Sequence, residues 1–370
     1  MRVLFLNQYF PPDLAPTGVL FGEIADALRA RGHEVEWVDA GQEYRTGQGT
    51  KMRLLREILA LVRMFFGGIF RKKRAHVVVS GSSPPCLAFV AWLVALRHWS
   101  PHLHWCMDLY PEIAVALREL RQGKLVFLMR WFMGLAYRRA YTVVGLDSDM
   151  LIRLNAYRIN ALECRPWVPA AVLATLPPSS DAAPAPVKRW QWLYSGNLGR
   201  AHDWQTLLAA QAELEERGVE ATLVFQGGGP SIEAAQKRAE ELRLKRIEWR
   251  PYAPEVELGT SLLRAHCLVV TELPEVKGLL WPSKLALILG LPRLVLFIGP
   301  KEGAIASLLR NESRAGVFAP GDFAAVANWI EAQRSAPDVF SQTCITDVRA
   351  HRERSLAWWC QSIERAGRRG

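Results

Sequence analysis

The sequence predicts an α/β protein with two doubly wound, Rossmann-like domains that face a central cleft, and three observations lead to this prediction. Short β-branched runs alternate with longer amphipathic stretches, a pattern that predicts parallel sheets covered by helices. The alternation stops at a segment rich in Pro, Ala and Ser and then starts again. The chain has 370 residues, half of them apolar, which suits two domains with separate cores.

The first domain is expected to span residues 1–175. The expected strands are residues 2–8, 34–40, 75–81, 102–108 and 141–147. The amphipathic stretches at 19–32 and 124–140 predict helices between these strands. The segment "LPPSSDAAPAPVK", residues 176–188, reads as the linker.

The second domain is expected to span residues 189–343. Its expected strands are residues 190–197, 220–230, 246–253, 267–273 and 293–299. In open α/β sheets ligands bind at the carboxyl ends of the strands. The functional residues should therefore lie in the loops that follow these strands.

Cysteine usage and hydropathy restrict the cellular context. The six cysteines form no close pair and have no histidine at metal-ligand spacing, so we expect reduced thiols in the cytoplasm and no metal site. The N-terminal "MRVLFLNQYFPP" lacks the long apolar core of a signal peptide. The apolar run at 86–96 is too short to span a bilayer, so a soluble or peripheral protein is expected.

The net charge of +10 is concentrated in residues 51–74, where eight Lys and Arg residues face one acid, Glu57. Bulky apolar residues lie among these cations, a composition typical of a helix at the surface of an anionic membrane. The alternative is a core helix with solvated basic ends; a nucleic-acid surface ranks below both, because no recognised module appears. The expected membrane contacts are Arg63, Phe65, Phe66, Arg71, Lys72, Lys73 and Arg74.

Two glycine-rich turns follow expected strands of the second domain. One is Ser195-Gly196-Asn197-Leu198-Gly199-Arg200, and the other is "FQGGGPS", residues 225–231. Glycine lets backbone amides approach a ligand, and an arginine beside a helix start favours an anion. Either turn alone would be weak support. The pair favours a nucleotide-diphosphate site.

Nearly the whole chain resembles the group 1 (family 4) glycosyltransferases of the GT-B fold, in particular the bacterial branch that builds O-antigen, colanic-acid-like and other exopolysaccharide units. The resemblance rests on "NQYFPPDLAPTGVLFGEIADALRARGHEVEWV", "VVVSGSSPPCLAFVAWL", "WCMDLYPE", "YSGNLGRAHDWQTLLAA", "LVFQGGGP" and "GLLWPSKLALIL". It implies a retaining transfer of a sugar from a nucleotide diphosphate sugar, with a UDP-linked donor expected. It implies no metal or other cofactor.

The resemblance also implies roles for single residues. Those matching the family's donor site are Gly18, Gly196, Asn197, Arg200, Gly228, Ser283 and Lys284. Gly18 could instead be a plain strand-to-helix turn. Asp108 and Glu112 of "MDLYPE" are the candidate catalytic carboxylates for the acceptor hydroxyl, or else caps of the following helix. His104 reads as a packed residue of a strand. His202 and Asp203 could reach the cleft, but Asp203 is also a good helix start, and neither is taken as catalytic.

The chain departs from the family pattern at Leu287, where relatives carry an acid that binds the donor ribose, and at Pro292, where they carry glycine. Glu272 or Glu275 could supply the missing acid, and Glu275 is taken as the donor-site candidate. Otherwise donor affinity is low or activity is lost. A GT-B chain is expected to return its last segment, here 344–370, to the first domain, with Trp358 and Trp359 as packing anchors.

The resemblance implies a polyprenyl-diphosphate-linked saccharide as acceptor, at the inner face of the cytoplasmic membrane, and no nucleic-acid partner. Two alternatives to an active transferase remain. One is a catalytically impaired, glycosyltransferase-like binding subunit of a polysaccharide-assembly complex, favoured by Leu287. The other is a nucleotide-sugar epimerase, disfavoured by the "DLYPE" and "PSK" segments.

Overall fold

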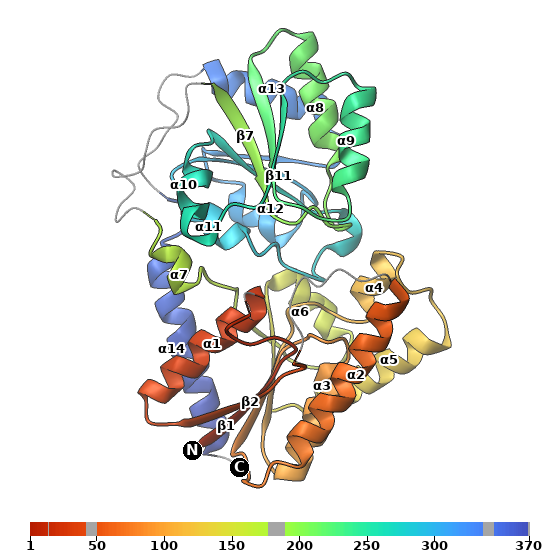
Figure 1. Cartoon of the computed structure of the whole chain (residues 1–370), viewed down its shortest axis with the longest axis vertical. Helices are drawn as coiled ribbons and strands as arrows, with labels where there is room; N and C mark the ends of the chain where they lie inside the picture. Colours follow the sequence, from red (N-terminus) through yellow and green to blue (C-terminus); the bar gives the residue numbers. More distant parts are fainter. Residues whose placement is uncertain (14, 42–49, 177–188, 336–343, 369–370) are drawn as a thin grey trace. The chain divides into compact units, whose positions relative to one another are not determined.

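The computed structural model describes residues 1–13, 15–41, 50–176, 189–335 and 344–368, and the chain forms two compact units (Figure 1). Unit 1 contains Met1–Pro169, Gly278–Trp281 and Arg352–Gly370. Unit 2 contains Ala170–Lys277 and Pro282–His351. Apart from Leu176, the expected linker lies outside the described residues.

Unit 1 is built on a six-stranded parallel sheet with the order β2-β1-β3-β4-β5-β6. Its strands are β1 (Arg2–Leu6), β2 (Glu34–Val38), β3 (Val77–Ser80), β4 (His102–Trp105), β5 (Thr142–Gly145) and β6 (Leu162–Glu163). The five expected strands are confirmed. The sixth, β6, was not predicted, because two exposed residues carry no pattern of strand burial.

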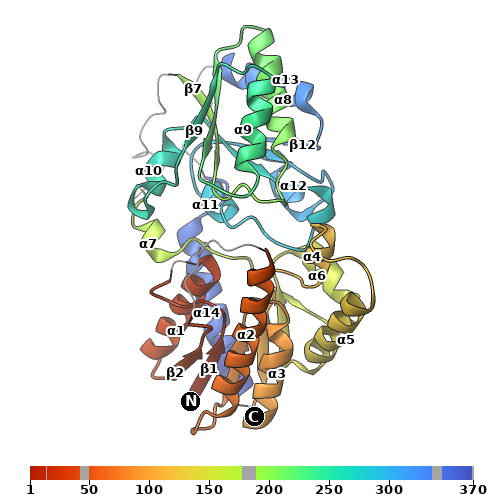
Figure 2. The same ribbon diagram turned by 45° about the vertical axis from the view of Figure 1, so that its right-hand side comes forward.

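Helices cover both faces of this sheet. They are α1 (Pro16–Ala30), α2 (Thr50–Ile69), α3 (Leu87–His98), α4 (Glu112–Ala116), α5 (Lys124–Arg139), α6 (Ser148–Asn155) and the part of α14 (Val348–Gly367) that follows His351. One face packs against α2 and α3, which lie side by side (Figure 2). On the other face Phe5 contacts Phe21 of α1, and Trp105 contacts the buried Trp359 of α14. Both faces of the sheet are thus removed from water, as a parallel sheet requires.

Unit 2 repeats this design with the strand order β12-β11-β10-β7-β8-β9. Its strands are β7 (Trp190–Ser195), β8 (Ala221–Gln226), β9 (Ile247–Arg250), β10 (Cys267–Thr271), β11 (Leu294–Ile298) and β12 (Ala315–Phe318). Its helices are α7 (Ala170–Leu173), α8 (Gln205–Glu216), α9 (Ile232–Glu241), α10 (Leu258–Leu263), α11 (Leu285–Leu289), α12 (Ala304–Leu309) and α13 (Phe323–Ser335), with 3₁₀ turns η2 (Glu255–Glu257) and η3 (Pro274–Val276). One face of the sheet forms a core with α8, α9 and α13. The expected α/β class and both doubly wound sheets are confirmed.

The strand order reverses once in each sheet. In unit 2 the chain runs from β7 to β8 on one side, whereas β10 adds to the other side of β7. In unit 1 the equivalent point lies between β1 and β3. Ligands of such sheets bind beyond the carboxyl ends of the strands at this point. The ends of β7 and β10 are therefore the place to look for a site in unit 2.

Candidate functional site

The two glycine-rich turns of unit 2 interlock at the ends of β7 and β8. The Gly196 N–H donates to the Gln226 carbonyl at 2.8 Å, and the Leu198 N–H donates to the Gly228 carbonyl at 2.7 Å. A Cβ on Gly227, whose φ is +139°, would lie 2.1 Å from the Gly196 carbonyl oxygen. Only glycine lets the two backbones approach this closely.

The interlock determines which amides of the first turn remain available. The Gly196 and Leu198 N–H groups are used inside the protein. Among the described residues, no hydrogen bond uses the N–H of Asn197 or Gly199. These two amides of the first turn are available to donate to an anion, whereas the Gly196 and Leu198 amides are already used.

The expected contribution of a helix N-terminus is not found at this turn. Helix α8 begins at Gln205, five residues beyond Arg200. Asp203 occupies the start of that helix, since its carboxylate accepts a bond from the Thr206 N–H at 3.1 Å. The structural interpretation of Asp203 is therefore confirmed, and this acid would repel an anion there.

Lys284 lies immediately before α11 and reaches the first turn. Its Nζ lies 3.0 Å from the centre of the Tyr194 ring, and a Cβ on Gly196 would be 3.9 Å from it. This nitrogen is buried and has no hydrogen-bond partner among the residues that the structure describes, although the Lys284 side chain as a whole is only half-buried. Burial holds the pKa of the Lys284 ammonium well below its ordinary value. A cation held over an aromatic face without a counter-ion is suited to an incoming anion.

His202 and Thr271 also belong to this cluster. The sequence suggested that His202 could reach the cleft but did not include it among the site residues, and Thr271 was not expected there. The His202 Nδ1 donates to the Thr271 carbonyl at 2.7 Å, because a carbonyl can only accept. Burial, reinforced by the charge of Lys284, lowers the pKa of His202 to about 3. The ring is therefore neutral, with Nε2 as an acceptor. The sequence carries no signal for the contact between His202 and Thr271, because this contact depends on the pairing of β7 with β10.

The remaining donor-site candidates surround this cluster in different ways. The Tyr252 ring, which the sequence did not suggest as part of the site, lies against Gly228. A Cβ on Gly228 would be 3.1 Å from this ring. Asn197 and Arg200 are exposed at the first turn, and Ser283 is exposed beside Lys284.

Of the two candidate acids, Glu275 is exposed on η3, and Glu272 is buried directly after β10. Leu287 is buried on α11, so this position presents no carboxylate to a ligand.

Asp108 lies in unit 1, in the loop that follows β4. Its N–H and that of Met107 both donate to the Ser82 Oγ, at 2.9 and 3.1 Å. Burial raises the pKa of the Asp108 carboxyl to about 6. The N-cap of α4 is Pro111, and no described side chain caps that helix. The capping alternative for Asp108 therefore has no support in the structure.

Glu112 is the first residue of α4 and is held by two partners. Its Oε1 accepts from the Tyr157 hydroxyl at 2.7 Å and from the Arg130 Nε at 3.1 Å. Its Oε2 is buried and has no partner among the described residues. The carboxylate is thus fixed in place, with one oxygen unused.

Gly18 is buried in the first turn of α1. A Cβ there would lie 2.7 Å from the Tyr9 carbonyl oxygen, so the glycine is required by close packing inside unit 1. This close packing accounts for the glycine without a ligand, as the alternative of a plain strand-to-helix turn also would.

The basic segment of α2 and the following turn shows both expected characters. Ala60 and Met64 are buried in the core, while the opposite face is apolar and exposed. Among the predicted membrane contacts, Phe66 is exposed, Phe65 is half-buried, and the Arg63 guanidinium lies against Gly41. The side chains of residues 50–54 lie outside the described part of the chain.

The basic cluster after α2 is largely engaged within the protein. Arg71 pairs with Glu36 at 3.2 Å and Lys73 with Glu34 at 3.6 Å. Arg74 donates to the carbonyls of His98 and Trp99 at the end of α3, both at 2.7 Å. Lys72 is exposed. Much of this cluster is therefore also structural.

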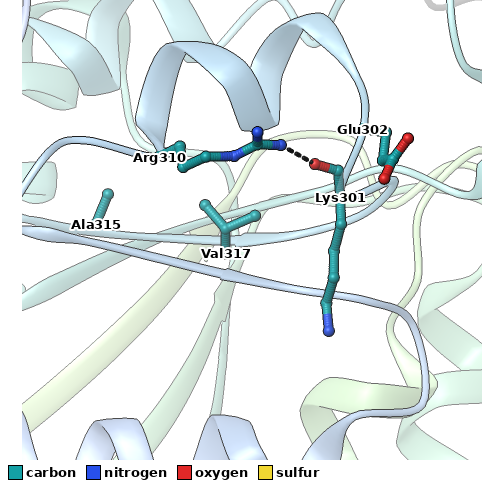
Figure 3. Close-up of a pocket in the computed structure, with 5 residues that line it drawn as sticks. All are labelled: Lys301, Glu302, Arg310, Ala315 and Val317. Carbon is teal, nitrogen blue, oxygen red and sulfur yellow. Dashed lines mark hydrogen bonds between the residues drawn. The ribbon is translucent and has the colours of Figure 1, made fainter.

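A pocket of about 480 Å³ opens elsewhere in unit 2, beside the edge strand β12 (Figure 3). It is lined by Lys301, Glu302, Arg310, Ala315 and Val317. The Lys301 Nζ is paired with Asp322 at 2.7 Å, and Arg310 donates to the Lys301 carbonyl at 2.7 Å. Its cations are thus already satisfied, unlike Lys284.

No helix in the described part of the chain combines the length and apolarity needed to cross a membrane. Within those residues, no group of three or more His, Cys, Asp or Glu side chains is placed to hold a metal ion. The six cysteines are free.

No family model and no curated protein matches the chain. Among solved structures, sucrose-phosphate synthase from Thermosynechococcus elongatus is similar at a TM-score of 0.70 and 14% identity, over 100% of this chain and 98% of that one. HepE of Anabaena in complex with UDP and glucose is similar at a TM-score of 0.63 and 13% identity, over 99% and 98%. The lipopolysaccharide outer core galactosyltransferase WaaB is similar at a TM-score of 0.61 and 13% identity, over 99% of each chain. The chain therefore has the fold of the GT-B glycosyltransferases.

Proposed function

We propose that the protein is a retaining glycosyltransferase that moves a sugar from a UDP-linked donor to a lipid-linked saccharide in cell-surface polysaccharide biosynthesis. The observation that carries the proposal is the buried Lys284 Nζ, which lies beside the interlocked glycine turns and has no hydrogen-bond partner in the described part of the chain. A diphosphate would supply the missing counter-charge. The HepE structures that resemble this chain hold UDP, UDP with glucose, and UDP-glucose.

The donor half of the reaction requires stabilisation of the leaving group. As the bond between the anomeric carbon and the β-phosphate oxygen breaks, negative charge collects on the diphosphate. Lys284 and the amides of Asn197 and Gly199 would receive that charge. The neutral His202 Nε2 can accept a hydrogen bond from a hydroxyl of the donor.

The acceptor half requires a group that orients the attacking hydroxyl and removes its proton. Asp108, with a pKa raised to about 6, is ionised at neutral pH yet basic enough to accept a proton. We assign it as the base and Glu112 as a carboxylate that binds the acceptor through its unused Oε2. Retention of configuration follows from the resemblance to the family.

The lipid-linked acceptor and a peripheral position on the inner face of the cytoplasmic membrane are supported by α2. Its exposed face carries a stripe of apolar residues, namely Leu55, Ile58, Leu59, Val62 and Phe66, continued by Phe70 after the helix. Exposed apolar residues at this spacing lie on one face of a helix and suit a lipid surface.

The proposal is tested by calorimetric titration with UDP, GDP and their sugar conjugates. Saturable binding of UDP that is weakened in Lys284→Met and unchanged in Lys301→Met supports the donor site. Lys301 is the matched control, since its ammonium is paired and lies in another pocket of unit 2. Absence of binding at millimolar nucleotide contradicts the proposal.

The second candidate is a catalytically impaired binding subunit of a polysaccharide-assembly complex, and the buried Leu287 favours it. Its mark would be acceptor or partner binding without nucleotide binding. The same titration separates the two functions.

A further inference from the structure

Large exposed apolar side chains are gathered on one part of unit 1. Eighteen such residues are exposed in the described part of the chain, and twelve of them belong to α2, α3, α5 or the residues directly after α2 and α3. Besides the five of α2 and Phe70, they are Leu96, Trp99, Leu125, Phe127, Leu128 and Trp131. The other six are scattered over both units, as single exposed apolar residues usually are.

The three helices form one layer, with α3 between α2 and α5 (Figure 2). Gly68 of α2 lies against Val94 of α3, where a Cβ would be 2.6 Å from a valine methyl. On the other side, Phe89 of α3 contacts Phe132 of α5 with ring centres 4.7 Å apart. Their outer faces therefore belong to one continuous surface, which we call the three-helix face.

The charge of the three-helix face is one-sided. The sequences of α2, α3 and α5 contain nine Lys and Arg residues and a single acid, Glu57. Glu57 accepts a hydrogen bond from the Gln8 Nε2 at 3.0 Å and is half-buried, and its single charge offsets one of the nine cations at most. Arg97, Lys124 and Arg139 are exposed at the ends of α3 and α5.

We propose that the whole three-helix face, with α5 as an essential part, lies flat on an anionic lipid membrane. This inference rests on the proposed lipid-linked acceptor and names the surface that meets the lipid. Aromatic and aliphatic side chains would enter the headgroup boundary, and the cations around them would contact lipid phosphates. Exposed apolar side chains with cations in large excess over acids are complementary to such a membrane.

Helix α5 also connects this surface to the acceptor carboxylates. The Arg130 Nε of α5 donates to Glu112, and the Arg130 Nη1 donates to Gln122 at 3.2 Å. Phe127 and Trp131, three residues before and one after Arg130, are exposed. Membrane contact through α5 would hold the end of unit 1 that carries Glu112 at the lipid surface, where a lipid-linked saccharide presents its sugar.

The test is flotation of the full chain with vesicles that contain phosphatidylglycerol, compared with vesicles of phosphatidylcholine alone. The α5 variant is Phe127→Ser with Trp131→Ser, and the α2 variant is Ile58→Ser with Val62→Ser. The control is Ile152→Ser with Val256→Ser, because these residues are 67% and 74% exposed but lie outside the layer. All substitutions are on the surface, and UDP titration of each variant reports on its folding.

The wild type and the control should float with the anionic vesicles, whereas the α5 variant should bind them about tenfold more weakly. Hydrogen exchange in α5 should also slow when these vesicles are added. If the α5 variant floats like the wild type and only the α2 variant detaches, the inference is overturned while the membrane partner of the proposed function stands. If the wild type does not bind anionic vesicles, both this inference and the proposed membrane partner are wrong. The donor function is then still tested by UDP binding. If the α5 variant instead dissociates a dimer, the face is a protein interface and the inference is wrong.

Discussion

Lys284 has an environment that stability alone would not favour. Its buried ammonium has no hydrogen-bond partner within the described residues, which raises the free energy of the folded state, and the contact with the Tyr194 ring offsets only part of this cost. Replacing it with an apolar side chain of similar length should therefore stabilise the protein while harming the site. Such an opposition between stability and function is expected at binding sites.

We predict that Lys284→Met weakens UDP binding about 10- to 100-fold, the usual contribution of a charge-assisted contact. In the absence of nucleotide, the same variant should be more stable by about 1 kcal/mol or more near pH 7. Because burial lowers the folded-state pKa of Lys284, this difference should shrink as the pH rises toward the ordinary lysine pKa of about 10.4. Calorimetry and urea denaturation at several pH values measure both effects. A variant that binds UDP normally would contradict the assignment.

Asp108 makes a separate prediction, because its raised pKa places its titration within the working range. Below pH about 6 the carboxyl is protonated and cannot accept the acceptor's proton, so kcat/KM should fall on the acid side. Asp108→Asn should reduce transfer about 10²- to 10⁴-fold and abolish that acid limb.

UDP affinity provides the control for Asp108, since this residue lies in unit 1 and the nucleotide cluster lies in unit 2. Affinity should stay the same in Asp108→Asn. His202 has a pKa of about 3 and should contribute no inflection above pH 5. A pH profile that is unchanged in Asp108→Asn would refute the role of this carboxylate as the base.

The paired glycine turns act as a single element, because each one fixes the position of the other. Gly227→Ala should cost about 2–4 kcal/mol of unfolding free energy, since the new methyl would meet the Gly196 carbonyl and strain a positive φ. UDP binding should weaken as well, because the displaced carbonyl belongs to the binding turn. Denaturant unfolding and UDP titration are the measurements.

Gly218→Ala is the matched control in the same unit. Gly218 also has a positive φ, +72°, but nothing lies within 4 Å of its absent Cβ. This variant should therefore lose only about 1–2 kcal/mol, and its UDP affinity should be unaffected. Equal losses in the two variants would show that backbone strain, not the close approach of the turns, sets the cost at Gly227.

The sequence was sufficient to predict elements that repeat a pattern, and less so those that depend on tertiary contacts. Buried strands such as β7 and β10 were predictable from continuous apolar runs. Strand β12, with the short sequence AGVF, gave no such signal. For α2, the core interpretation describes one face of the helix, whereas the other face is exposed and apolar, and its contact with a membrane stays a prediction. The Lys284 cluster combines residues of β7 and β10 with residues of the loops before α8 and α11, and its distances depend on strand pairing that no local pattern reveals.

The whole chain carries a net charge of +10, and the three-helix face is where a large share of it meets exposed apolar surface. Electrostatic attraction to a membrane is screened by salt, with a Debye length of about 10 Å at 0.1 M that shortens as the salt concentration rises. Burial of apolar side chains is not weakened in this way. The two contributions can therefore be separated by ionic strength.

We predict that raising NaCl from about 0.1 to 0.5 M reduces flotation with anionic vesicles severalfold without abolishing it, because the aromatic contacts remain. The Phe127→Ser, Trp131→Ser variant lacks these contacts on α5, so it should detach almost completely at the higher salt. Vesicle flotation across a salt series measures both slopes. Binding of the wild type that is indifferent to salt would mean that the cations of the three-helix face do not contact lipid phosphates. Complete loss of wild-type binding at high salt would mean that its aromatic side chains do not enter the membrane.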